Sequence, residues 1–166
     1  MPNFPNNGIM FRDVTTLFNH ASAFEKAVSQ FEDLWREEKV KAIAGIDARG
    51  FIIVGALASK WGLPFIALRK KGKLPFDTIS EEYDLEYGKA SLEIHTDAIK
   101  KGDSVLIVDD LIATGGTAIA GVNLINALGG NIVGCGFIID LPDLGGAKKL
   151  EDLGIKVKSL LTFEGE

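Results

Sequence analysis

The residues best suited to chemistry lie together in residues 105–117, which read VLIVDDLIATGGT. An apolar run predicts a buried strand that ends in two acids, Asp109 and Asp110, before a loop of small residues and a helix. Paired carboxylates there can accept hydrogen bonds from a diol or hold a hydrated Mg²⁺. The segment 114–117 adds unhindered backbone N–H groups and two threonine hydroxyls at the positive end of the helix dipole. Together these features predict a phosphate site.

Three alternative structures for this stretch make different demands on the sequence. The simplest is a plain strand-to-helix turn, with threonine as the cap and glycine supplying the turn angles. A Walker phosphate loop requires a lysine after its second glycine, and no lysine lies between 102 and 147. A dinucleotide fingerprint requires a third glycine after Gly134 and Gly136, but Ile139 occupies that place. The composition of the loop therefore favours a single phosphate.

The elements that must position this loop alternate along the chain. Apolar runs predict strands at 42–46, 65–68, 105–108, 132–139 and about 157–161. Helical spacing or length predicts helices at 24–35, 50–61 and 116–128. This alternation predicts a doubly wound, mainly parallel α/β sheet with helices on both faces. A ligand would bind at the carboxyl ends of its strands.

One segment, 69–103, breaks the alternation because it is long, polar and charged. Its apolar and polar residues alternate over 91–95, so we expect a hairpin at the sheet edge, with about 69–95 forming a mobile lid. The chain of 166 residues is the size of one domain.

Composition excludes several classes of function. A net charge of -5 disfavours a general nucleic-acid binder. The one cysteine, Cys135, excludes an intrachain disulfide and a cysteine-rich metal site, and its apolar surroundings predict a buried thiol. The apolar runs are shorter than the roughly 18 residues that span a bilayer, and the first residues have no targeting pattern. We therefore expect a cytoplasmic protein that binds neither nucleic acid nor membrane.

Several segments in a fixed order resemble one known family. With residues 105–117, they are 8–17 (GIMFRDVTTL), 45–51 (GIDARGF), 69–75 (RKKGKLP), 85–88 (LEYG) and 141–146 (LPDLGG). The phosphate stretch is similar to the ribose-phosphate signature of the type I phosphoribosyltransferases. The other segments are similar to those of the adenine-specific branch of that family.

The resemblance implies a reaction and its cofactor. Adenine and 5-phosphoribosyl 1-pyrophosphate (PRPP) would give AMP and pyrophosphate, in purine salvage. Mg²⁺ would be held mainly by PRPP, within reach of Asp109 or Asp110 through water. The same resemblance implies a homodimer, and an N-terminal hood over about 1–20.

Site residues follow from the same resemblance. The 5′-phosphate and ribose would bind to Asp109, Asp110, Ala113, Thr114, Gly115, Gly116 and Thr117. Pyrophosphate would bind to Ala48, Arg49, Arg69, Lys70 and Lys73, although the composition of the basic run 69–73 alone favours a solvated loop. Phe11, Arg12 and Leu144 would contact adenine.

The expected catalytic group is Glu86, with Tyr87 closing over the site. Related oxopurine enzymes place an Asp just before the Thr-Gly of the phosphate loop, where this chain has Ala113. A methyl group exchanges no proton, so a carboxyl group for the purine would have to come from elsewhere. The resemblance implies that Glu86 of the lid supplies it. We expect a closed lid to raise the pKa of Glu86 by excluding water.

Other functions remain open from the sequence. Another purine could be the acceptor, or the fold could serve a non-catalytic regulator that senses PRPP. A phosphotransfer receiver domain would account for Asp109 and Asp110 but not for the Thr-Gly-Gly-Thr loop.

Overall fold

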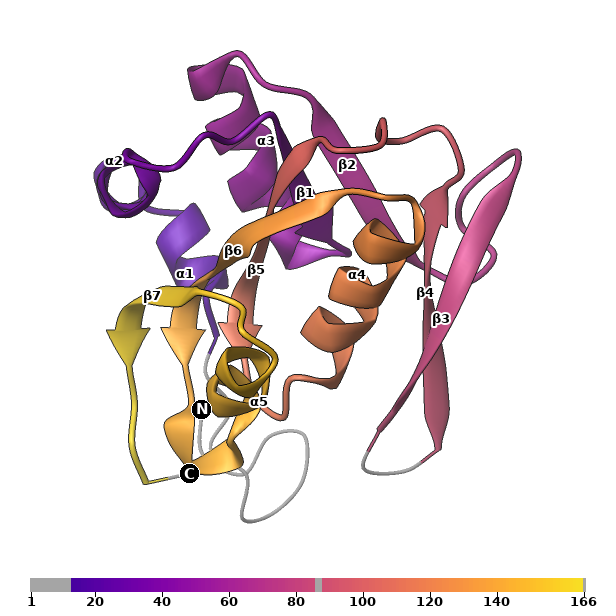
Figure 1. The fold of residues 1–166 in the computed structure, drawn as a ribbon. Coiled ribbons are helices and arrows are strands. Elements are labelled where there is room, and N and C mark those ends of the chain that lie inside the picture. The colour runs from indigo at the N-terminus through magenta and orange to yellow at the C-terminus, as the bar shows by residue number, and fades with distance from the viewer. Residues whose placement is uncertain (1–12, 86–87, 166) are drawn as a thin grey trace.

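A computed structural model describes residues 13–85 and 88–165 (Figure 1). Its centre is a seven-stranded sheet in the order β3-β4-β2-β1-β5-β6-β7. The strands are β1 (Ala42–Ile46), β2 (Phe65–Lys70), β3 (Thr78–Asp84), β4 (Lys89–His95), β5 (Ser104–Ile112), β6 (Asn131–Asp140) and β7 (Val157–Thr162).

The sheet is mainly parallel, as the sequence predicted. β1 pairs in parallel with both β2 and β5, and β6 pairs in parallel with β5 and β7. The expected edge hairpin is also present, because β3 and β4 are antiparallel to each other and β4 adds to β2. The carboxyl ends of the five parallel strands therefore meet at one edge of the sheet.

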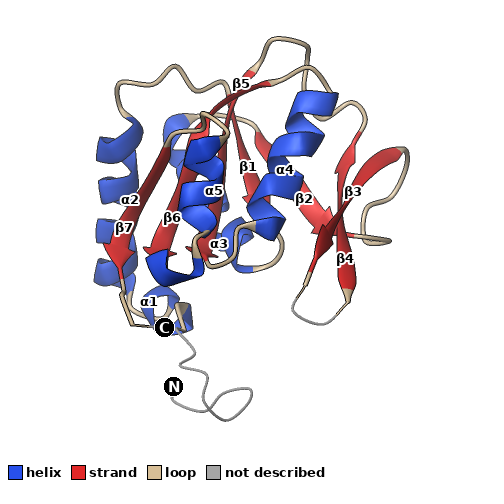
Figure 2. Cartoon of the chain, turned by 60° about the horizontal axis from the view of Figure 1, so that its bottom comes forward, coloured by secondary structure: helices blue, strands red, loops and turns tan. Residues whose placement is uncertain are grey.

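Helices cover both faces of the sheet (Figure 2). One side carries α1 (Thr15–Phe18), α2 (Ala21–Trp35) and α3 (Arg49–Trp61), and the other carries α4 (Gly116–Ala127) and α5 (Gly146–Asp152). A short 3₁₀ helix, η1 (Pro142–Leu144), precedes α5. The two helical layers confirm the doubly wound arrangement.

The core consists of two apolar clusters separated by the sheet. Phe31 and Trp35 of α2 pack against one face of the strands, and Leu124 and Ile125 of α4 pack against the other. β5 lies between them, and its residues 105–108 are completely buried. Burial on both faces explains why its sequence is a continuous apolar run.

The structure corrects the expected end of β5. The strand continues past Val108 to Ile112, so Asp109 and Asp110 lie within it rather than beyond it. Asp109 still pairs with Phe137 of β6, and Ile112 with Asp140. The ladder holds both acids in a regular backbone.

Cys135 is a free, buried residue of β6, and burial raises the pKa of its thiol to about 12. The sequence prediction of a buried cysteine is confirmed. Across 13–85 and 88–165, the structure contains no helix with both the length and the apolar character needed to span a membrane.

Candidate active site

A cavity of about 200 Å³ lies where β5 meets α4. Its lining includes all seven residues predicted to bind phosphate and ribose, together with one residue predicted to bind pyrophosphate. The lining residues are Arg49, Asp109, Asp110, Leu111, Ile112, Ala113, Thr114, Gly115, Gly116, Thr117, Ala118 and Phe137.

Two helices begin at this edge of the sheet without a side-chain cap. The N-cap of α4 is Gly115, and that of α3 is Ala48; neither has a side chain that accepts a hydrogen bond from the first turn of its helix. The threonine cap expected for a plain turn is therefore not formed. Uncapped first turns leave backbone N–H groups available at the positive ends of the helix dipoles. Both helix starts are suited to binding anions.

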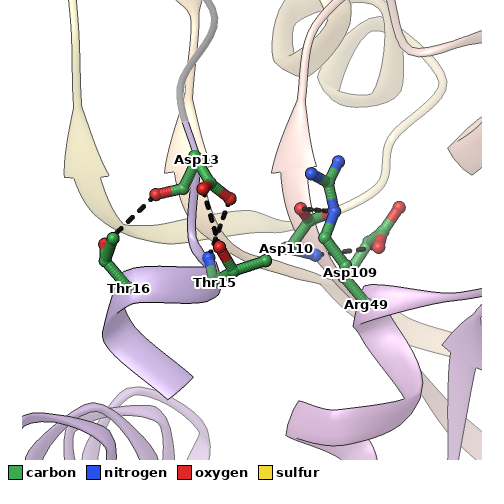
Figure 3. A network of polar contacts seen from close by, with 6 residues as sticks. All are labelled: Asp13, Thr15, Thr16, Arg49, Asp109 and Asp110. Atoms are coloured by element: carbon green, nitrogen blue, oxygen red, sulfur yellow. Dashed lines mark hydrogen bonds and ion pairs between the residues drawn. The ribbon is translucent and has the colours of Figure 1, made fainter. Parts of the chain in front are cut away.

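Arg49, the first residue of α3, forms an ion pair with an acid of β5. Its Nε lies 2.7 Å from Oδ2 of Asp110, whose side chain is only 7% exposed (Figure 3). Asp109 accepts a hydrogen bond from the Asp110 N–H at 2.8 Å through Oδ1. The same oxygen would lie 2.9 Å from a Cβ added to Gly50, so a side chain at this position would collide with Asp109.

The environment shifts the pKa of two nearby acids in opposite directions. Burial, reinforced by the neighbouring Asp110 carboxylate, raises the pKa of Asp109 well above its ordinary value. Hydrogen bonds from the Thr15 hydroxyl and N–H lower the pKa of Asp13, and the positive charge of Arg49 lowers it further. Asp109 is therefore the more basic acid at this edge of the sheet.

The predicted basic segment is only partly directed at this edge. Arg69 Nε lies 3.4 Å from Oδ2 of Asp47, and Lys73 Nζ lies 4.0 Å from the same oxygen. Lys70 follows Arg69 within β2 and is exposed, so its side chain projects to the opposite face of the sheet. Arg69 and Lys73 are thus brought to the loop that precedes α3.

A buried carboxylate supports the basic segment. Glu93 of β4 is 8% exposed and accepts a hydrogen bond from the Gly72 N–H at 3.0 Å. Arg69 Nη1 also donates to the carbonyl oxygen of Lys73 at 3.2 Å. These contacts hold the turn after β2 against the hairpin.

The hairpin β3–β4 lies beside the start of α4. A Cβ on Gly116 would lie 3.4 Å from the carbonyl oxygen of Asp84 and 3.7 Å from the Tyr83 ring. The predicted Glu86 and Tyr87, as well as Phe11 and Arg12, lie outside the described residues. Leu144 is 40% exposed at the end of η1, two residues before Gly146, which contacts the phosphate loop.

Several residues at the site were given no role from the sequence. Asp47 pairs with the basic segment, Glu93 supports it, and Gly146 and Lys149 hydrogen-bond to the phosphate loop. Asp47 stands at the end of an apolar run, which is a usable sequence signal. The roles of Glu93 and Lys149 depend on contacts between distant segments, for which the sequence has no local pattern.

Within 13–85 and 88–165, the structure contains no group of three or more His, Cys, Asp or Glu side chains that could hold a metal ion.

Comparison with known proteins agrees with this geometry. The family described as "Phosphoribosyl transferase domain" matches residues 14–160. An adenine phosphoribosyltransferase of Dinoroseobacter shibae is 54% identical over all of this chain and 93% of its own length.

Solved structures extend the similarity to the fold. The adenine phosphoribosyltransferase of Thermoanaerobacter pseudethanolicus has a TM-score of 0.94 at 44% identity, covering 98% of this chain and 94% of its own. The Saccharomyces cerevisiae enzyme, complexed with an imino-altritol bisphosphate and adenine, has a TM-score of 0.91 at 38% identity, covering 97% and 92%. From its fold and its full-length similarity, the chain belongs to the adenine phosphoribosyltransferase family and has the type I phosphoribosyltransferase fold.

Proposed function

We propose that the protein transfers the phosphoribosyl group of PRPP to adenine, giving AMP and pyrophosphate in purine salvage. The observation that carries the proposal is the convergence of two uncapped helix starts with Asp109 and Asp110 of β5 at one edge of the sheet. This combination suits a ligand with separate anionic groups and a diol between them. In the reaction, the bond from the anomeric carbon to pyrophosphate breaks and a bond to an adenine ring nitrogen forms. Adenine loses one N–H proton to solvent in this direction.

The phosphate loop and the acids would hold the phosphoribosyl group. Backbone N–H groups of 114–117 bind the 5′-phosphate, and Asp109 and Asp110 accept hydrogen bonds from the ribose hydroxyls. Asp110 would contact the ribose and Arg49 the pyrophosphate, and these two residues are paired with each other. Both parts of PRPP would therefore bind to the same ion pair. The loop thereby orients the anomeric carbon toward the incoming base.

Pyrophosphate would bind between the start of α3 and the turn that follows β2. Ala48 offers backbone at the helix start, while Arg49, Arg69 and Lys73 supply positive charge. Lys70 projects to the other face of β2, so its contribution requires movement of the turn. Fixed positive charge at the leaving group favours bond breaking because negative charge accumulates there.

Mg²⁺ fits this site as a partner of PRPP. Carboxylate oxygens are ligands that Mg²⁺ accepts, and the ion commonly retains several waters beside substrate phosphates. Asp109 and Asp110 could reach such an ion through water, although Asp110 Oδ2 is engaged by Arg49. When bound, Mg²⁺ shields the charge of the pyrophosphate group.

Adenine would be bound by Phe11, Arg12 and Leu144, and the lid would supply Glu86 and Tyr87. The support for a lid is the position of β3 beside the start of α4, because the hairpin leads directly to residues 86 and 87. Glu86 then hydrogen-bonds or protonates a ring nitrogen of the purine. Tyr87 covers the closed site.

The test compares steady-state kinetics with adenine, hypoxanthine, guanine and xanthine, each with PRPP and Mg²⁺. Adenine should be the strongly preferred acceptor. Comparable efficiency on an oxopurine would show that the acceptor is a different base. PRPP binding with no release of pyrophosphate upon addition of adenine would instead identify a PRPP-sensing regulator.

We also propose that the 166 residues form a single cytoplasmic domain, with a hood over about 1–20 and a lid over about 69–95, that assembles as a homodimer. Ile52 and Phe65 are 47% and 44% exposed, and Phe51 packs edge-on against Phe65. Exposed apolar side chains of this kind suit contact with a second copy of the chain. Sedimentation of the wild type and of Ile52→Glu tests the assembly: a wild-type monomer at assay concentrations would contradict it.

A further inference from the structure

The start of α5 lies directly against the phosphate loop. A Cβ added to Gly146 would lie 2.3 Å from the carbonyl oxygen of Ala113, and one added to Gly115 would lie 2.9 Å from Cα of Gly146. Backbone therefore packs on backbone, with no room for a side chain at either glycine. A segment more than thirty residues later in the chain thus shapes the loop.

Two successive carbonyl groups of the loop accept hydrogen bonds from α5. The Gly146 N–H donates to the Ala113 carbonyl oxygen at 2.9 Å, and Lys149 Nζ donates to that of Thr114 at 2.9 Å. Gly146 and Lys149 are three residues apart, so they share one face of the helix. The next residue, Leu150, is completely buried and anchors α5 to the core.

These two bonds determine which way the loop presents its N–H groups. In a trans peptide unit, the carbonyl of one residue and the N–H of the next point in opposite directions. Because the carbonyls of Ala113 and Thr114 are directed at α5, the N–H groups of Thr114 and Gly115 are directed away from it. Gly115 has φ of 84°, a conformation that glycine adopts readily.

We propose that Lys149 is a positioning residue for the phosphate loop. It holds the Thr114–Gly115 peptide in the orientation that makes the N–H of Gly115 available to the 5′-phosphate. The proposal rests on the proposed function, since it assigns the phosphate of PRPP and AMP to this loop. Lys149 acts through the loop and does not contact the reacting atoms.

The chain offers a matched control. Lys148 precedes Lys149, is also exposed, and pairs with Asp152 within α5 at 3.0 Å. Lys148→Met and Lys149→Met therefore remove the same charge from neighbouring positions, but only the second removes a bond to the loop. Lys149→Arg keeps a positively charged donor at this position, so it tests whether such a donor restores phosphate binding.

Kinetics and binding provide the first readout. Lys149→Met should raise the KM for PRPP roughly tenfold and weaken AMP binding similarly, as loss of a charged hydrogen bond does. Adenosine lacks the phosphate, so its calorimetric affinity should stay within about twofold of wild type. Lys149→Arg should restore most of the loss, and Lys148→Met should match the wild type.

Amide NMR of the ligand-free protein provides the second readout. The Gly115 signal should shift in Lys149→Met and not in Lys148→Met, because the peptide is reoriented before any ligand binds. Unchanged AMP affinity, or equal weakening of AMP and adenosine, would overturn the proposal. An unchanged Gly115 signal with weaker AMP binding would also overturn it, by indicating direct contact between Lys149 and the ligand. An inactive wild type would count against the proposed function instead, since the AMP and adenosine comparison does not require turnover.

Discussion

The guanidinium of Arg49 and the carboxylate of Asp110 form an ion pair of 2.7 Å that links the start of α3 to the end of β5. Removing Arg49 would leave a nearly buried carboxylate without this partner. We expect Arg49→Met to lower the free energy of unfolding by about 1–3 kcal/mol and to raise the KM for PRPP. Urea unfolding and steady-state kinetics measure the two effects.

A double substitution separates stability from binding in the same pair. Asp110→Asn in the Arg49→Met background removes the unpaired charge, so much of the lost stability should return while PRPP affinity stays low. If the double variant is as unstable as the sum of the two single variants, the ion pair does not couple these residues.

The raised pKa of Asp109 predicts that its carboxylate destabilises the fold at neutral pH, while the proposed role of the same group is to bind PRPP. In the unfolded chain this carboxyl has its ordinary pKa of 3.8, so the folded state holds the proton to a higher pH. The free energy of unfolding therefore falls as the pH rises from 3.8 through the pKa that Asp109 has in the folded state. Above that pKa, the buried negative charge of Asp109 destabilises the fold. Asp109→Asn should raise the Tm at pH 7.5, by at least about 2 °C if the cost is ~1 kcal/mol. The same change should weaken PRPP binding.

The pH dependence provides the control. The Tm advantage of Asp109→Asn should shrink as the pH approaches 3.8, because the wild-type carboxyl becomes neutral as well. Asp13→Asn should have the opposite effect, because the pKa of Asp13 is lowered in the folded protein. The variant should be less stable than the wild type at neutral pH, and the difference should disappear in strong acid. A Tm advantage for Asp109→Asn that is constant with pH would contradict the assignment.

Two glycines of α3 should respond differently to alanine. A Cβ at Gly50 meets Asp109 Oδ1 at 2.9 Å and the Val108 carbonyl oxygen at 3.1 Å, whereas one at Gly55 meets nothing within 4 Å. Gly50→Ala should displace Asp109 and reduce kcat/KM for PRPP. Gly55→Ala should raise the free energy of unfolding by about 0.5–1 kcal/mol with activity unchanged. Equal behaviour of the two variants in urea unfolding and kinetics would refute this contrast.

Glu86→Gln tests the proposed proton donor of the lid. General acid catalysis contributes about 100–10,000-fold, so kcat should fall by at least tenfold while the KM for PRPP changes little. Glu82→Gln is a suitable control, because Glu82 is an exposed residue of the same hairpin, paired only loosely with Lys89 at 3.8 Å. A loss below tenfold in Glu86→Gln would remove the catalytic role.

The strands and the phosphate loop could be predicted because their signals are local. The apolar run at 105–108 and the small residues after Asp110 determine a buried strand and a tight helix start within a dozen positions. β1 begins and ends where its apolar run does, at Ala42 and Ile46. Burial on both faces leaves an unambiguous pattern in the sequence.

The remaining features depend on contacts that no local pattern records. The sequence indicated a hairpin but not the bounds of β3, because the polar residues of β3 pair with β4 and pack only partly on α4. The seven residues of α5 contain two adjacent lysines and only one fully buried side chain, Leu150. Its contact with the phosphate loop follows from the parallel pairing of β5 and β6, which brings the segments after both strands together.

The buried position of Cys135 has a practical consequence for measuring lid movement. It is the only cysteine of the chain, and a thiol with a pKa of about 12 is almost entirely protonated at neutral pH. Because the thiolate is the reactive form, maleimide and iodoacetamide reagents should leave the native protein unmodified. A cysteine introduced at Asp84, at the end of β3, would then be the single labelling position for a fluorophore or spin probe. The wild-type chain is thus already a suitable background for spectroscopy, with no native thiol to replace.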